Sequence, residues 1–474
     1  MKNKAQNKQE EKSNTYKKIK TSYITTSTTV VVVLLLTLMI LGSSSVSLPL
    51  TYAQNATESA SIFTSSEDTN AGDIIPGQFI LTVRNETMLQ EALPALSDAA
   101  EQSDLKVVNT FPNLGVLVLN GSENSVPALS DAAEQNDTGV VIEANRIVTA
   151  LGQTLPTGIN RIDAESSSSS SSSSAATSNT MSTNQTKMSN LDNVQIGIID
   201  TGIDLKNEEL NVVSDVSFVP GEPTGQDGNG HGTHVSGIAA AKDDSDGVVG
   251  VAPGAKLTAI KVLSASGSGS TASVLAGLDY ALQHANELDV VNLSLGGPGT
   301  SVATNTAITK LQRAGVPVVV AAGNDNEDAA FFSPANAPDA WTVSSILDTD
   351  GKCGGLGGAN DDSFLSFSNY GSVVEIAAPG GKINSTIPGG KYAQFSGTSM
   401  AAPHVAGAVA LYKSSHPDAS PAEIFNKLIE AANKSDTACD TAANNGKGYI
   451  KSWTFDRDNI REPLLYVKEF VTTK

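Results

Sequence analysis

The sequence predicts an α/β fold, a doubly wound and mostly parallel sheet with helices on both faces, preceded by a small α+β domain. From Val194 onwards, short apolar runs alternate with segments of helical character. The runs 196–199, 290–293 and 316–320 are largely apolar, as is typical of strands that are buried on both faces of a parallel sheet. In such sheets the functional residues gather beyond the carboxyl ends of the strands.

A smaller unit, residues 73–151, comes before this pattern. Within it a ten-residue segment at 93–102 nearly recurs at 126–135, and both copies are alanine-rich with proline in the first turn. Both copies are therefore predicted to be short helices. We expect them to alternate with strands at 79–83, 116–119 and 140–143.

The first 53 residues have the features of an export signal. Lys17, Lys18 and Lys20 precede an apolar run from Val30 to Leu41. A membrane span needs about 20 apolar residues, so this run has the length of a signal-peptide core. We predict a signal peptide at 1–53 and a secreted protein; the alternative is an N-terminal segment that stays uncleaved and anchors the chain in a membrane.

Two polar stretches divide the rest of the chain. Residues 54–72 form a predicted linker, and residues 166–190 form a serine-rich insert that buries no apolar surface. The predicted order is thus a signal peptide, a linker, an N-terminal domain at 73–151 and a main domain at 152–474 that carries the insert.

Charge and cysteine content exclude several classes of protein. There are 30 basic and 50 acidic residues, a formal net charge of −20, which argues against nucleic-acid binding because that needs clustered Lys and Arg. The two cysteines, Cys353 and Cys439, are too few for a disulfide scaffold. They could form one bridge in an oxidising compartment, and the sequence leaves that open.

Asp200 and His231 are the first two candidates for chemistry. Asp200 follows the first buried strand directly, where a carboxylate serves equally well as an acid, a helix cap or a metal ligand. His231 lies among glycines that bring the backbone close and leave the imidazole room, and a helix follows at 235–241. His234 lies three residues further on, but the Glu of a zinc-binding helix is missing, so His234 is interpreted as structural.

Ser399 and Asn324 complete the set. A serine at a helix N-terminus gains from the positive end of the helix dipole, and its own N–H can face an oxyanion. Ala401 breaks the Gly-x-Ser-x-Gly pattern of lipases and esterases. Asn324 closes a strand and could donate a second hydrogen bond to an oxyanion, although a lone asparagine there is more often a turn residue.

Together, in the order Asp, His, Asn, Ser, these residues resemble the subtilase family, above all in the segments Gly230–His234 and Gly397–His404. The resemblance extends from Gly152 to about Asp456. It implies a serine endopeptidase that works through an acyl-enzyme, with Ser399 as nucleophile, His231 as base and then acid, Asp200 orienting His231, and Asn324 holding the oxyanion.

The resemblance also implies which segments bind substrate. Ser294, Leu295 and Gly296 match one substrate-pairing strand, and Gly267, Ser268 and Gly269 match the strand on the opposite side. Pairing of this type recognises extended peptides mainly by their backbone, so it implies broad specificity with an apolar preference.

Two further features follow from the resemblance. Residues 73–151 are similar to the inhibitory propeptide of subtilases, which implies self-cleavage near Leu151 and a propeptide that remains a partner of the enzyme beside protein or peptide substrates. The loop 242–248 is similar to a calcium loop, which implies structural Ca²⁺ with ligands from Gln153, Glu209, Lys242, Asp244, Asp246 and Val248. Glu209 stands where Asp is usual, and a solvated acidic turn is the alternative.

Two other functions compete with the active endopeptidase. One is a catalytically silent relative that binds partners at the cell surface, which the intact set Asp200, His231, Ser399 and Asn324 disfavours. The other is a non-peptidase serine hydrolase, which the mismatch at Ala401 disfavours. No stable membrane partner is expected unless the N-terminal segment is retained.

Overall fold

The computed structural model describes residues 71–83, 105–122, 140–150, 191–244, 247–348, 363–432 and 462–467, with a few further residues between and beyond these ranges. The predicted signal peptide, the serine-rich insert, both cysteines and Leu151 lie outside the described residues. The predictions made for them therefore stay predictions.

The N-terminal sheet consists of four antiparallel strands. β1 lies between β3 and β4, and β2 pairs with β3. β2 was not predicted, because only the two ends of its sequence are buried and its middle mixes polar and half-buried residues without regular alternation. The two predicted helices at 93–102 and 126–135 lie largely outside the described residues. The strands are β1 (Ile74–Val83), β2 (Leu105–Phe111), β3 (Val116–Gly121) and β4 (Val140–Ala150).

The main sheet has eight strands in the order β14-β13-β11-β9-β5-β7-β6, with β15 also paired to β13. Every pair is parallel except β13 with β14. The predicted α/β class with a mostly parallel sheet is confirmed. The strands are β5 (Gln195–Asp200), β6 (Asn211–Ser217), β7 (Lys256–Lys261), β9 (Val290–Leu293), β11 (Val318–Ala321), β13 (Trp341–Leu347), β14 (Ser363–Phe364) and β15 (Ile376–Gly381).

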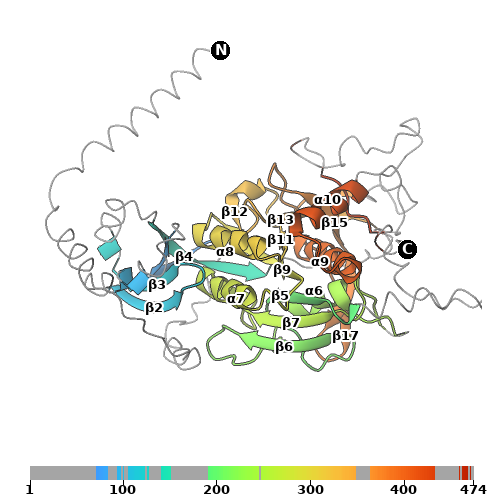
Figure 1. The fold of residues 1–474 in the computed structure, drawn as a ribbon, viewed down its shortest axis with the longest axis horizontal. Coiled ribbons are helices and arrows are strands. Elements are labelled where there is room, and N and C mark those ends of the chain that lie inside the picture. Colours follow the sequence, from blue (N-terminus) through green and yellow to red (C-terminus); the bar gives the residue numbers. More distant parts are fainter. Residues whose placement is uncertain are drawn as a thin grey trace, which may run out of the picture. The chain divides into compact units, whose positions relative to one another are not determined.

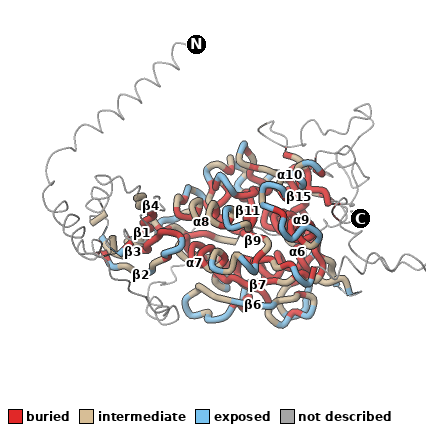
Figure 2. The backbone as a smooth tube through the Cα atoms, viewed as in Figure 1, coloured by how far each residue is buried: buried red, intermediate tan, exposed pale blue. Residues whose placement is uncertain are grey.

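Helices cover both faces of the main sheet (Figure 1). Ile196 and Ile198 of β5 belong to the apolar cluster that includes residues of α6, α9 and α10, whereas Ile199 belongs to the cluster that includes residues of α7 and α8. Successive strand residues point to opposite faces, so both faces must be apolar, and the central strands are buried throughout (Figure 2). The helices are α6 (His231–Ala240), α7 (Thr271–Gln283), α8 (Val302–Arg313), α9 (Thr398–Ser415) and α10 (Pro421–Ala432).

Short strands connect the N-terminal sheet to the main domain. The end of β4 pairs antiparallel with β8 (Ser268–Ser270) on one side and with β10 (Leu295–Pro298) on the other. β10 in turn pairs with β12 (Phe332–Ser333), which follows the short helix η7 (Ala329–Phe331). A hairpin of β16 (Ile383–Ile387) and β17 (Lys391–Phe395) leads into α9. Among the described residues, no helix has the length and apolar character needed to cross a membrane.

Candidate active site

Asp200 and His231 are in direct contact. Asp200 is the last residue of β5 and is fully buried, and His231 is the first residue of α6, so the helix begins earlier than the predicted 235. The Asp200 Oδ1 atom lies 2.8 Å from His231 Nδ1 and accepts a hydrogen bond from the Thr201 N–H at 2.7 Å. This contact requires Nδ1 to carry the proton, which leaves Nε2 as the basic nitrogen of His231.

Asp227 holds the beginning of α6. Its carboxylate is buried and accepts five hydrogen bonds, from the N–H groups of Asn229, Gly230 and Thr233 and from the hydroxyls of Thr201 and Thr233. The side chain thus ties the end of β5 to the helix that carries His231. This role of Asp227 was not predicted from the sequence. Its signal was an aspartate a few residues before a helix start and among glycines, a position suited to capping.

Ser399 is the second residue of α9 and is fully buried. Its hydroxyl donates to the Ser294 carbonyl oxygen at 3.0 Å, and the Ser294 hydroxyl donates to the Ser399 carbonyl oxygen at 2.8 Å. A hydroxyl has one proton, so in this state the Ser399 proton is directed at Ser294, the residue between β9 and β10, rather than at His231. The Ser399 hydroxyl has to rotate before it can pass that proton to the imidazole.

Asn324 follows β11 and is oriented by the residue before Ser399. Its Oδ1 atom accepts hydrogen bonds from the Thr398 N–H at 2.9 Å and from the Thr398 hydroxyl at 3.0 Å. Its Nδ2 group is buried and has no hydrogen-bond partner among the described residues. A buried N–H₂ group without a partner is costly, and an oxyanion would satisfy it.

All six predicted substrate-binding residues lie beside the end of β4. Leu295 pairs with Ala150 and Gly296 with Thr149, while the neighbouring Ser294 makes the contacts with Ser399 described above. On the other side, Ser268 and Gly269 pair with β4, and the Gly267 carbonyl oxygen accepts a hydrogen bond from the Ala150 N–H at 2.9 Å. The positive φ of Gly267, +79°, permits the turn into β8. The end of β4 is therefore the middle strand of three.

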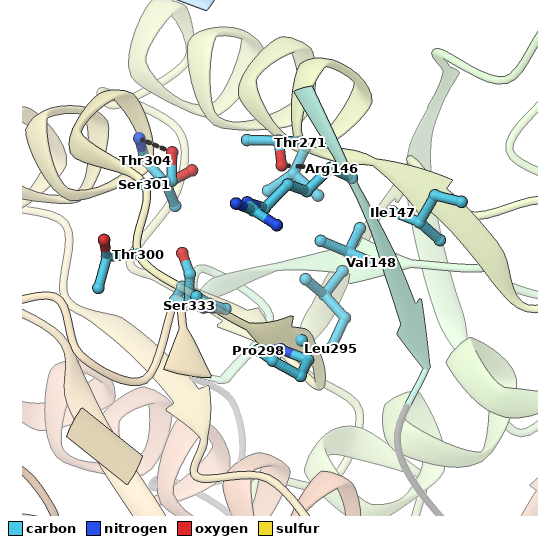
Figure 3. A pocket seen from close by; sticks show the side chains of 14 residues that line it. Arg146, Ile147, Val148, Thr271, Leu295, Pro298, Thr300, Ser301, Thr304 and Ser333 are labelled. Carbon is cyan, nitrogen blue, oxygen red and sulfur yellow. Dashed lines mark hydrogen bonds between the residues drawn. The ribbon is translucent and has the colours of Figure 1, made fainter. Parts of the chain in front are cut away.

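Two cavities lie along this strand. The first holds Arg146 and Val148 of β4 against Leu295 and Pro298 of β10 (Figure 3), and Arg146 Nη1 donates to the Gly72 carbonyl oxygen at 2.7 Å. The second lies at the end of β4, with Thr149, Ala150, Asn229, His231, Ser266, Gly267, Ser268 and Phe395 around it. The strand thus leads past a pocket of mixed lining, in which Val148 lies with Leu295, to the imidazole.

The two other histidines of this region are neutral and structural. Burial lowers the pKa of His234 to about 3, against the opposing effect of its contacts with the Ala393 and Ile383 carbonyl oxygens. Burial likewise lowers the pKa of His404 to about 4, against its hydrogen bond to the Met400 carbonyl oxygen. Because Nε2 of His234 donates to two carbonyl groups and its ring stacks on Phe395, this side chain acts as a packing residue.

The predicted calcium loop gathers around Glu209. The Lys242 N–H donates to the Glu209 carbonyl oxygen at 3.0 Å, and the Val248 N–H donates to the Glu209 carboxylate at 3.4 Å. The other carboxylate oxygen accepts a hydrogen bond from the Tyr392 hydroxyl. Glu209 is therefore a hydrogen-bonded carboxylate in this structure, and no cluster of three or more acidic, His or Cys side chains occurs among the described residues. Gln153 and Asp246 lie outside them, and calcium stays a prediction.

Comparison with known proteins agrees with this geometry. The subtilase family model matches residues 192–449, more than half of the chain. The alkaline protease of Alkalihalobacillus alcalophilus is 40% identical over 291 residues, which cover 61% of this chain and 68% of the relative. Subtilisin Savinase of Lederbergia lenta is 41% identical over 280 residues, covering 59% and 92%. A solved structure of a cold adapted subtilisin-like serine proteinase is 35% identical, with a TM-score of 0.47. The match covers 59% of this chain and 90% of the chain in that structure. The chain belongs to the subtilase family and is a serine endopeptidase.

Proposed function

We propose that this endopeptidase is made as a precursor, cuts its own chain near Leu151, and then cleaves extended, apolar peptide segments of other proteins. The observation that carries the proposal is the position of β4. The strand lies between β8 and β10, antiparallel to both, and its last described residue, Ala150, borders the same cavity as His231. A substrate held as the middle strand of three would place its next peptide bond beside Ser399.

Each of the four catalytic candidates has a separate role in this reaction, performed by a particular atom. They are Ser399, His231, Asp200 and Asn324. Ser399 Oγ attacks the carbonyl carbon while Nε2 of His231 takes its proton, and the carbon–nitrogen bond then breaks as that proton passes to the leaving amine. Water, deprotonated by the same Nε2, hydrolyses the acyl-enzyme, and Ser399 Oγ regains a proton. Asp200 Oδ1 holds the Nδ1 proton and stabilises the imidazolium. Asn324 Nδ2 and the Ser399 N–H would donate to the oxyanion, and removal of one such donor costs about 3–4 kcal/mol of barrier.

The N-terminal sheet would act as an inhibitor after the cut. Glu143 of β4 accepts hydrogen bonds from the Ser301 hydroxyl at 2.6 Å and from the Val302 N–H at 2.8 Å at the beginning of α8. Asn145 accepts a hydrogen bond from the Ala272 N–H at 3.1 Å at the beginning of α7. These contacts do not involve the peptide bond after Leu151, so they would persist once that bond is broken and keep β4 in the cleft.

Val148 supports the apolar preference. Its side chain lies with Leu295 in the cavity of Figure 3, and Leu151, three residues later, is itself apolar. The predicted export signal at 1–53 supports a secreted enzyme, for which N-terminal sequencing of protein recovered from the medium is the test.

Self-cleavage of the purified full chain tests the proposal. Wild type should yield two fragments with a new terminus near residue 152, whereas Ser399→Ala should stay intact. Ser415→Ala, at the far end of the same helix, is the matched control and should cut like wild type. An intact wild-type chain, or equal cutting in Ser399→Ala, contradicts the proposal.

A further inference from the structure

Lys261 is a fully buried cation beside the candidate active site. It ends β7 and lies opposite Asp200 in the register of β5 and β7. Its Nζ donates to the carbonyl oxygens of Thr201 at 2.6 Å and Leu263 at 2.8 Å, two backbone groups just beyond the ends of β5 and β7. Lysine is almost never fully buried unless its charge is paired. The position therefore needs a counter-charge.

Glu222 supplies that counter-charge and makes a second contact. One oxygen, Oε2, lies 3.0 Å from Lys261 Nζ, and the other, Oε1, accepts a hydrogen bond from the Ala265 N–H at 3.0 Å. Ala265 precedes Gly267 and β8, the strand that pairs with β4. The Glu222 side chain is 31% exposed, so solvent reaches the ion pair from the Glu222 side, whereas the Lys261 side chain is fully buried.

The pair acts on both halves of the site through short connections. Thr201, whose carbonyl oxygen Lys261 binds, donates its own N–H to the Asp200 carboxylate and its hydroxyl to Asp227. On the other side, Ala265 accepts a hydrogen bond from the Asn229 side chain, next to the cavity that His231 borders. One ion pair thus holds both the Asp200 carboxylate, through Thr201, and the segment that leads into β8, through Ala265.

The charge of the pair matters as much as its contacts. Among the described residues, the ionisable groups around His231 are Asp200 on β5, Asp204 and Asp227 in the loops beside α6, His234 on α6 itself, and the Lys261–Glu222 pair behind Thr201. While both partners are present their charges cancel. Loss of either partner leaves one unit charge close to the imidazole in a poorly solvated region, where it interacts more strongly than in water.

We propose that Lys261 and Glu222 are positioning residues for catalysis: they hold Thr201 and Ala265 on the two sides of the site and keep the charge beside Asp200 and His231 balanced. This inference rests on the roles proposed above for Asp200 and His231. Neither side chain touches the substrate, so their effect is exerted through Thr201 and Ala265.

The test is the pH dependence of kcat/KM for the self-processed enzyme on a soluble peptide. Glu222→Gln leaves a positive charge, which disfavours the imidazolium, so the acid limb of the profile moves to lower pH. Lys261→Met leaves a negative charge, so the limb moves to higher pH. We expect shifts of roughly 1 pH unit in opposite directions, the effect of a unit charge at about 10 Å near a protein surface. The double variant should return the limb to its wild-type position while kcat stays lower, because the hold on Thr201 is lost.

Glu287→Gln is the matched control, since it removes the same charge from an exposed turn beyond α7 that borders neither cavity along β4. A purely structural role would lower the unfolding temperature of Glu222→Gln and leave the limb where Glu287→Gln leaves it, which would overturn the inference. If Lys261→Met does not fold, the comparison of Glu222→Gln with Glu287→Gln decides alone. Absence of Ser399-dependent activity in wild type would instead reject the proposed function, so the two failures are distinguishable.

Discussion

The main sheet and the N-terminal sheet are stabilised in different ways. The main sheet is covered on both faces by its own helices, and its strands contribute to two apolar clusters. The N-terminal sheet has one small cluster of its own, around Leu81 and Leu117. The residues of its other face, including Ile80, Leu114 and Val118, belong to the cluster that α7 and α8 form on the main sheet. The main sheet is thus complete in itself, whereas the N-terminal sheet completes its core only by docking.

Besides the pairing of β4 with β8 and β10, local polar contacts join the N-terminal sheet to α7 and α8. Lys310 of α8 donates to the Asn113 carbonyl oxygen at 2.6 Å, and Asn113 donates to Asp279 of α7 at 3.2 Å. With Glu143 and Asn145 they form a small set of bonds around one apolar contact. A segment held in this way can bind tightly and still leave as a unit, which is what a removable inhibitor requires.

Acid should break the main sheet first, with the largest effect. All five histidines of the chain lie in the main domain, and burial lowers the pKa of His234 to about 3 and of His404 to about 4. Their unfolded pKa is near 6.5, so their contribution to stability is complete above pH 6.5 and is lost as the pH falls toward the folded values. At pH 5 this is a loss of about 2 kcal/mol for each histidine, or about 4 kcal/mol together.

Urea unfolding of the uncut Ser399→Ala chain at pH 7.5 and pH 5 measures this loss. His416→Gln, which removes an exposed histidine, should leave the difference unchanged. Equal stability at the two pH values would mean that His234 and His404 become protonated inside the folded protein.

Asn324→Ala should separate chemistry from folding. Loss of the Nδ2 donor removes about 3–4 kcal/mol of transition-state stabilisation, so self-cleavage slows about 10²–10³-fold while both sheets keep their structure. The rate is followed by intact mass after refolding begins. Asn193→Ala, at an exposed position before β5, should cut at the wild-type rate. A variant Asn324→Ala that cuts as fast as wild type would remove Asn324 from the proposed oxyanion site.

Leu114→Ala should loosen the N-terminal sheet alone. Leu114 is fully buried in the cluster shared with α7 and α8, and such a truncation costs about 3 kcal/mol. Hydrogen exchange of the uncut Ser399→Ala chain should then show lost protection in β1–β4 and little change in β5, β9 and β11. Equal loss in both sheets would mean that they unfold as one unit.

The sequence could predict the strands of this fold that are marked by a short apolar run between polar turns. β9 was predicted at its observed bounds and β5 within a residue, because an apolar run between polar turns identifies a buried parallel strand. The contact of Asp200 with His231 depends on a shared sheet edge, which the strand pattern implies. Asp227 and Lys261 could not be foreseen in the same way. A buried charge is recognised by its partners, and those of Lys261 are two backbone carbonyl groups and a glutamate 39 positions earlier in the chain (261 − 222).

Glu143→Gln should have the smallest effect on how tightly the N-terminal sheet is held on the main domain. It tests the contribution of the polar contacts most sharply, because it removes a charge without changing the shape of the side chain. Hydrogen bonds to a charged group contribute about 1.5–3 kcal/mol, and glutamine keeps one oxygen that can accept, so we expect a loss of about 2 kcal/mol. The negative charge also favours the N-terminus of α8, which adds to the same loss. Release of the cut N-terminal domain, seen as the delay between self-cleavage and full activity, should therefore become about 30-fold faster.

Self-cleavage itself should keep its rate, since Glu143 contacts α8 and not the cleft. Glu208→Gln, an exposed carboxylate of the main domain, should leave the delay unchanged. An unchanged delay in Glu143→Gln would mean that the apolar contact around Leu114 alone holds the two sheets together.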